Sequence, residues 1–199
     1  MIMKKYGLIA VILWVCSCGD PAKEGFNKYI FIPDKEDPNL PAYTEYGYNT
    51  FGATYGDSYF LSGENSSVNV SYQNEILNLC LQGYQEDTDD TESMSLTFSF
   101  PSPPVQTYQD LASLNGTVID LTGASCHLIM AKGVTTDTLV VSSGCLNFKR
   151  VQLLRIDKIE DRAILSGTFD AQFLRNEQPE VILNGRFDLG VTYVYYNNE

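Results

Sequence analysis

The most regular feature of the sequence is an alternation of apolar and polar residues that begins near Asn49 and continues almost to the C-terminal end. A period of two residues is typical of β-strands that bury one face. The alternation is clearest over residues 68–72, 77–81, 94–100, 165–173 and 181–195. These segments predict a series of antiparallel strands, each with one apolar face.

The last of these segments is longer than an ordinary strand. Residues 181–195 keep one phase well beyond the usual strand of about 5–6 residues, so we expect a bend at Gly185 or Gly190. Residues 108–114 form the one short helix that the sequence predicts, closed by Asn115 and Gly116. No internal repeat is present. The prediction is therefore a single all-β domain, an antiparallel β-sandwich or β-barrel with at most one short helix.

The N-terminal residues have the pattern of an export signal. Lys4 and Lys5 precede an apolar run, 6–15, which is too short for a membrane-spanning helix of about 20 residues. The run ends in Val15-Cys16-Ser17-Cys18, which resembles a bacterial lipobox. The resemblance implies that residues 1–17 are removed as a lipoprotein signal peptide and that Cys18 is lipidated. Two or more acyl chains anchor a protein stably, since each buried CH₂ contributes about 0.8 kcal/mol.

Residues 18–48 are expected to form a tether between the lipid anchor and the domain, residues 49–199. Four prolines interrupt this segment, and Pro-rich segments stay extended. Residues 29–32, Tyr-Ile-Phe-Ile, are too apolar for a free linker. We expect them to form an edge strand or, as the less favoured alternative, a strand lent to a partner.

The charge and the histidine count narrow the possible functions. The formal charge of −12 becomes −14 when Lys4 and Lys5 are lost with the leader. Such an acidic surface argues against nucleic acid as a partner, because Lys and Arg supply the affinity for phosphate. The single histidine, His127, rules out a His-rich zinc site and any site that needs two imidazoles. We therefore expect no metal, no cofactor and no enzymatic activity.

Three cysteines follow Cys18, namely Cys80, Cys126 and Cys145. In an oxidising compartment they allow three single pairings, each of which leaves one thiol over. We favour a disulfide between Cys126 and Cys145, which would join neighbouring strands and stabilise the fold by about 3 kcal/mol.

Three short motifs carry a resemblance to a known group of proteins. They are Asn-Thr-Phe-Gly at 49–52, Ser-Gly-Thr-Phe at 166–169 and Gly-Arg-Phe-Asp at 185–188. In this order they resemble a family of uncharacterised Bacteroidetes envelope lipoproteins. The resemblance implies a lipid-anchored all-β domain and supplies no catalytic residues. Relatives often have Cys where this chain has Ala53, so no disulfide is carried over from them.

Two groups of side chains are candidates for contact with a ligand. Five tyrosines crowd the start of the domain: Tyr43, Tyr46, Tyr48, Tyr55 and Tyr59. Exposed aromatic rings stack on sugars or on a partner, and otherwise they cover a sheet edge. Asp170 and Asp188 lie at similar places on the last two strands, where a surface ion pair of Asp188 with Arg186 is a better interpretation than catalysis.

These observations predict a lipid-anchored, exported protein of the outer membrane, on its periplasmic or its surface side. The favoured function is a non-catalytic binding module that recognises a glycan or another envelope protein. The alternative is a structural or assembly subunit, similar to a fimbrillin, that exchanges strands. A hydrolase is the least favoured class, because no nucleophile motif accompanies His127.

We expect Cys18→Ala to abolish incorporation of a clickable palmitate analogue, because the acyl acceptor is lost. The measurement is in-gel fluorescence after growth with the analogue. Cys16→Ala is the matched control and should stay labelled. Continued labelling of Cys18→Ala would contradict the anchor.

Overall fold

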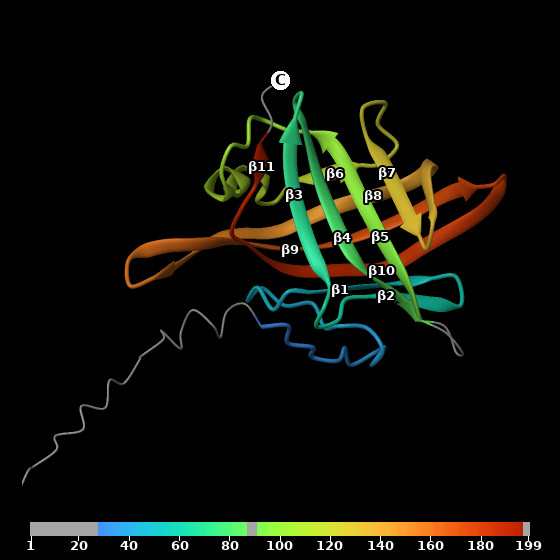
Figure 1. Ribbon diagram of the computed structural model, residues 1–199, viewed down its shortest axis with the longest axis horizontal. Helices are drawn as coiled ribbons and strands as arrows, with labels where there is room; N and C mark the ends of the chain where they lie inside the picture. Colours follow the sequence, from blue (N-terminus) through green and yellow to red (C-terminus); the bar gives the residue numbers. More distant parts are fainter. Residues whose placement is uncertain (1–27, 87–90, 197–199) are drawn as a thin grey trace, which may run out of the picture.

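The computed structural model describes residues 28–86 and 91–196, which form eleven strands and one short 3₁₀ helix (Figure 1). The predicted signal peptide and Cys18 lie outside these residues. The elements are β1 (Thr50–Tyr55), β2 (Ser58–Leu61), β3 (Ser67–Gln73), β4 (Ile76–Glu86), β5 (Thr91–Pro101), η1 (Tyr108–Leu114), β6 (Val118–Asp120), β7 (His127–Lys132), β8 (Thr135–Ile156), β9 (Ile159–Arg175), β10 (Gln178–Val191) and β11 (Tyr195–Tyr196).

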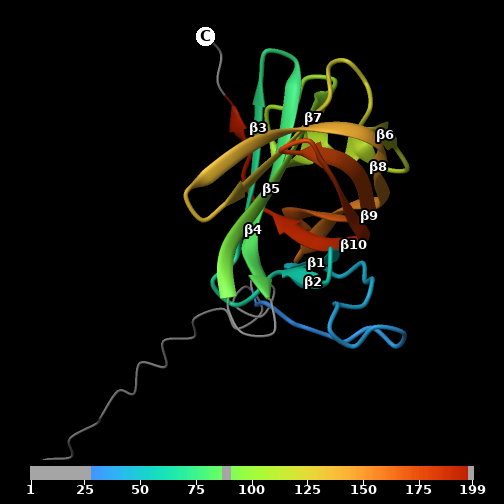
Figure 2. The same ribbon diagram turned by 90° about the vertical axis from the view of Figure 1, so that its right-hand side faces the viewer.

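The strands belong to one sheet whose pairings return to their starting point. Following the antiparallel pairs from β1 leads through β2, β4, β5, β7, β8, β9 and β10 and back to β1. One edge of β4 makes this possible, because it pairs with β3 over its first half and with β2 over its last three residues. The sheet therefore curls around a common core (Figure 2), and the predicted all-β fold is confirmed.

The core is built by the apolar positions of the alternating segments. Phe98 and Phe169 meet edge to face with ring centroids 5.2 Å apart, and Phe148 meets Phe187 in the same way at 5.7 Å. Each buried phenylalanine stabilises the fold by about 1.5–3 kcal/mol. The helix η1 adds Leu111 and Leu114 to this core, so the predicted helix is present, in the 3₁₀ form.

Strand β10 contains the predicted irregularity. Its register against β9 shifts between Ile182 and Gly185, one of the two glycines at which we expected a bend. An added Cβ at Gly185 would lie 2.3 Å from the carbonyl oxygen of Phe169, so only glycine fits there. The expected single strand 181–195 ends at Val191, and β11 then pairs in parallel with β3 of the same chain.

Residues 28–48, which we call the strap, lie against the sheet instead of forming a free tether (blue in Figure 1). The strap folds back on itself through hydrogen bonds from Ala42 N to Ile32 O (2.6 Å) and from Ile30 N to Tyr48 O (3.0 Å). Leu40 is fully buried. The folded unit therefore begins at least 20 residues before the predicted boundary at Asn49. Residues 29–32 form no strand, and Ile30, Phe31 and Ile32 are 37–40% exposed.

A single buried carboxylate fixes the strap. Asp188 on β10 is 1% exposed and accepts hydrogen bonds from Gly47 N (2.8 Å), Tyr46 N (3.1 Å) and Tyr48 N (3.2 Å). The hydroxyls of Thr44 (2.5 Å) and Ser166 (2.9 Å) also donate to it. Charge-assisted hydrogen bonds of this kind are about twice as strong as neutral ones.

The predicted ion pair of Asp188 with Arg186 is wrong, because both side chains bind the strap. Arg186 Nη1 lies 2.6 Å from Asp34 Oδ2. Under the strap, Ile164 and Ser166 on the outer face of β9 are buried, although the alternation placed this face in solvent. Gly47 has a φ of +74°, and an added Cβ would lie 3.2 Å from Ile164 Cγ1, so glycine permits this close approach.

We expect Asp188→Asn to lower the free energy of unfolding by about 3 kcal/mol. The amide keeps one acceptor oxygen and turns an NH₂ group toward backbone N–H groups that need an acceptor. Urea unfolding measures the loss, and hydrogen exchange should show faster exchange at the amides of residues 46–48.

Asp170→Asn is the matched control, because Asp170 is half-buried and its side chain has one hydrogen-bond contact among the described residues, the Cys145 thiol at 3.8 Å. It should cost less than about 1 kcal/mol. Equal losses in the two variants would show that Asp188 does not hold the strap.

Candidate binding site at the turn end of the sheet

The hairpin turns β1–β2, β7–β8 and β9–β10 lie at one end of the curled sheet, which we call the turn end. It is at the right in Figure 1 and faces the viewer in Figure 2. The last residues of β4 reach the same end, because they pair with β2 next to the β1–β2 turn.

The inward positions of the strands change from apolar to polar at this end. On β9, for example, buried Phe169, Ala171 and Phe173 are followed in the same phase by Arg175. On β1, Phe51 and Ala53 are followed by Tyr55. The same change on the other strands creates a polar layer above the core, which consists of Tyr55, Ser58, Gln85, Lys132, Asp137, Arg175 and Glu180.

A hollow of about 440 Å³ lies in this layer. It is lined by six of the seven side chains, Asp137 being the exception, together with Gly56 and Asp57 of the β1–β2 turn and Pro179 and Val181 at the start of β10. Ligand sites commonly have volumes of about 300–1,000 Å³, and the mouths of closed sheets are among their preferred places. The hollow is therefore our candidate binding site.

Arg175 holds the polar layer together. Its Nε donates to Asp137 Oδ2 (2.9 Å), and its Nη1 donates to the Tyr55 hydroxyl (3.3 Å). The Asp137 carboxylate, through this hydrogen bond, is the main reason that the pKa of Arg175 is raised. The guanidinium is thus held charged and in place by groups from β8 and β1.

Tyr55 is 8% exposed, and its hydroxyl donates to a carboxylate oxygen of Glu180. Burial, followed by this hydrogen bond to Glu180, raises the pKa of Tyr55 to about 12. The phenol is therefore neutral at physiological pH and keeps the proton that it shares with Glu180.

Gln85 has an unusual environment. Its Nε2 donates to Ser58 Oγ (2.5 Å), and Ser58 Oγ donates to the carbonyl oxygen of Tyr55 (2.9 Å). Its Oε1 is buried and has no hydrogen-bond partner within the described part of the chain. An unsatisfied buried acceptor costs about 1–3 kcal/mol, and a ligand or a water that donates to it would recover this cost.

Three of the four charged residues that line the hollow have a partner. Lys132 Nζ lies 3.5 Å from Glu92 Oε2, Arg175 is paired with Asp137, and Glu180 accepts from Tyr55. Across residues 28–86 and 91–196, no three His, Cys, Asp or Glu side chains come together in a way that would hold a metal ion. The arrangement offers hydrogen bonds to a ligand, and Asp57, exposed in the β1–β2 turn, is the one charged lining residue without a partner among the described residues.

The five predicted tyrosines do not form one surface. Tyr55 lines the turn-end hollow, whereas Tyr43 and Tyr46 line another hollow of about 440 Å³ on the strap, beside Arg150. The rings of Tyr46 and Tyr48 pack together with their centroids 5.4 Å apart. The Tyr59 hydroxyl accepts a hydrogen bond from Asn39 Nδ2 (3.1 Å) in the strap.

Sequence reasoning thus found one residue of the candidate site and missed Ser58, Gln85, Lys132, Arg175 and Glu180. The signal that would have found them is a polar residue at the last inward position of each strand, where the alternation calls for an apolar one.

Cys80, Cys126 and Cys145 are free thiols in the structure. Cys145 lies opposite Asp120 in the pairing of β8 with β6, and Asp120 also acts on Cys126. Burial and then nearby carboxylates raise the pKa of both thiols, which disfavours the reactive thiolate. The disulfide between Cys126 and Cys145 stays a prediction for the oxidised protein.

His127 is exposed at the start of β7, opposite Ser99 of β5. Among the described residues, no helix has the length and apolar character needed to cross a bilayer. The chain matches no known family model, no curated protein and no solved structure. The resemblance to envelope lipoproteins therefore stays a prediction that depends on three short motifs.

We expect the stability of the wild-type protein to fall more steeply between pH 10 and pH 12 than that of Tyr55→Phe. The pKa of Tyr55 is about 12 in the folded chain and about 10 when unfolded, so its contribution is complete below pH 10 and is lost as the pH rises toward 12. Urea unfolding at several pH values measures the two slopes.

Tyr46→Phe, at a ring that is 64% exposed, controls for the loss of any one phenol. Parallel slopes for wild type and Tyr55→Phe would mean that the Tyr55 phenol is not held by its surroundings.

Proposed function

We propose that the protein is a lipid-anchored envelope module that binds a compact, uncharged, hydroxyl-rich ligand, such as the end of a glycan chain, in the turn-end hollow. The observation that carries this proposal is that Gln85, whose buried side-chain oxygen Oε1 has no hydrogen-bond partner among the described residues, lines a hollow together with other hydrogen-bonding side chains.

The pairing of the charges favours an uncharged ligand. A carboxylate or phosphate would compete with Asp137 for Arg175 and with Glu92 for Lys132. An ammonium group at Glu180 would likewise compete with the Tyr55 hydroxyl, which leaves Asp57, exposed in the β1–β2 turn, as the only lining carboxylate without a partner among the described residues. A sugar hydroxyl can instead donate to Gln85 Oε1 and accept from a neighbouring donor, which leaves every existing pair intact.

The strap supports a position close to the membrane. If Cys18 carries the lipid, about ten residues separate it from Lys28, where the described chain begins. Even fully extended, ten residues span only about 35 Å. The proposed module would therefore take its ligand near the membrane surface, as expected for recognition of an envelope component.

The experiment is thermal unfolding of the purified protein against neutral sugars, with uronic acids and amino sugars as charged counterparts. A neutral sugar at 100 times its Kd should stabilise the wild type by about 2.7 kcal/mol, which raises Tm by roughly 5–10 °C. Gln85→Leu should lose most of this shift, because the acceptor is gone while the side chain keeps a similar size.

Gln172→Leu is the matched control, since Gln172 is exposed on β9 away from the hollow. It should keep the full shift. A shift with charged sugars alone would contradict the proposed ligand class, and an unchanged shift in Gln85→Leu would contradict the proposed site.

A further inference from the structure

The outer face of β3, β4, β5, β7 and the start of β8 carries no charged side chain across several rows of paired residues. One row runs through Asn69, Cys80, Thr97, Ile129 and Thr138. The next row runs through Ser67, Gln82, Ser95, Ala131 and Thr136. We call these two rows, with the row of Ser71, Asn78, Ser99 and His127 beside them, the hydroxyl face.

The absence of charge is unusual for this molecule. The chain has a formal charge of −12, and 19% of its residues are charged. A surface designed for solubility carries about 25–35% charged residues with both signs interspersed. A face without charges exerts little electrostatic force on a ligand. It therefore neither repels an uncharged partner nor attracts a charged one.

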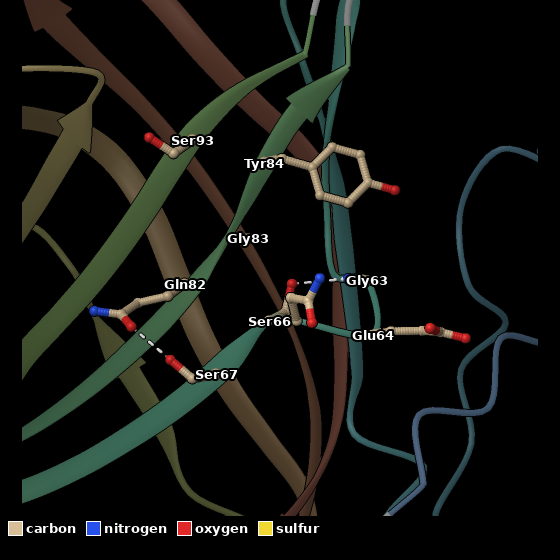
Figure 3. Close-up of a pocket in the computed structure, with 9 residues that line it drawn as sticks. Gly63, Glu64, Ser66, Ser67, Gln82, Gly83, Tyr84 and Ser93 are labelled. Carbon is tan, nitrogen blue, oxygen red and sulfur yellow. Dashed lines mark hydrogen bonds between the residues drawn. The ribbon is translucent and has the colours of Figure 1, made fainter.

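The hydroxyl face is hollowed where its second row ends. Two hollows of about 410 and 260 Å³ share Gln82, Gly83 and Ser93, so they form one trough across β4 and β5. Figure 3 shows the larger of the two. Figure 3 shows the ring of Tyr84 at one side of the trough and Glu64, the one charged residue among those lining it, at its end. Small side chains floor the trough, so an extended chain fits better than a bulky group.

The hydrogen bonds of the face leave donors turned outward. Ser67 Oγ donates to Gln82 Oε1 (2.5 Å), as the dashed line in Figure 3 marks. This bond fixes the Gln82 amide so that its NH₂ group is left to bind a ligand. Ser99 Oγ donates to Asn78 Oδ1 (2.6 Å), and Asn78 Nδ2 donates to Ser71 Oγ (3.4 Å). The side chains are thus ordered before any ligand arrives, which lowers the entropic cost of binding.

We propose that the hydroxyl face is a second binding site, which takes an extended neutral polysaccharide lying across the strands. Neighbouring strands are about 4.8 Å apart, a spacing close to the length of one sugar ring, and three of the five residues in the first row and four of the five in the second carry a hydroxyl or amide group. Neutral hydroxyls match this chemistry, whereas an acidic polysaccharide meets a protein of the same sign. The site stands apart from the turn-end hollow and does not depend on it.

The test is affinity electrophoresis of the full-length protein in native gels that contain dextran, laminarin or mannan, with polygalacturonate as the acidic counterpart. At least one neutral polymer should retard the wild type. Gln82→Glu should weaken this retardation about tenfold or more, because the substitution keeps the shape and places a negative charge in the trough. Gln172→Glu is the same substitution at an exposed position outside the face and should leave retardation unchanged.

Two further results decide between sites and partners. The Gln85→Leu variant, which is altered in the turn-end hollow, should be retarded like the wild type. If this variant is no longer retarded, the polymer binds at the turn-end hollow and the proposal is overturned. Failure of all three neutral polymers would overturn it as well. A wild-type dimer in sedimentation velocity that Gln82→Glu dissociates would overturn it in favour of contact between copies of this chain.

Discussion

The buried carboxylate of Asp188 is the interaction on which the outer layer of the structure depends. It accepts hydrogen bonds from three consecutive backbone N–H groups of the strap, of which that of buried Gly47 would otherwise lack an acceptor. By holding residues 46–48 in place, it also closes the strap over Ile164 and Ser166. Strands β9 and β10 are therefore covered on both faces, by the phenylalanine core on one and by the strap on the other.

The same alternation that builds the core also supplies the candidate site. Each strand continues its inward phase past the last apolar residue, so Tyr55, Gln85 and Arg175 are carried on the strands that carry Phe51, Leu81 and Phe173. Rigid strands fix their positions better than loops would. Hydrogen bonds of Arg175 and Tyr55 join β1, β8, β9 and β10 within the polar layer, so this layer also closes one end of the core. Its structural role and its proposed binding role therefore depend on the same contacts.

The alternation was sufficient to predict the all-β class, the short helix at residues 108–114 and an irregularity near Gly185, because these follow from local period and turn chemistry. It failed for the strap, where prolines suggest a free linker and the deciding partner, Asp188, lies about 140 residues away. It also failed for Arg186, which was predicted to form an ion pair with Asp188 and instead pairs with Asp34. Of the site, only Tyr55 was found, since long-range pairing decides which strand ends meet.

Charge explains why the two proposed sites suit uncharged ligands in so acidic a protein. At the turn end, Asp137 and Glu180 each accept from a donor that a charged ligand would have to displace. On the hydroxyl face, the two rows carry no charged side chain, and Glu64 lies at the end of the trough. These are two physical routes to the same selectivity: a bound partner makes a charge less available to a ligand, and a row without charges offers none. Both leave hydrogen bonding as the attraction that remains, and hydrogen bonds reward a partner with many closely spaced hydroxyls.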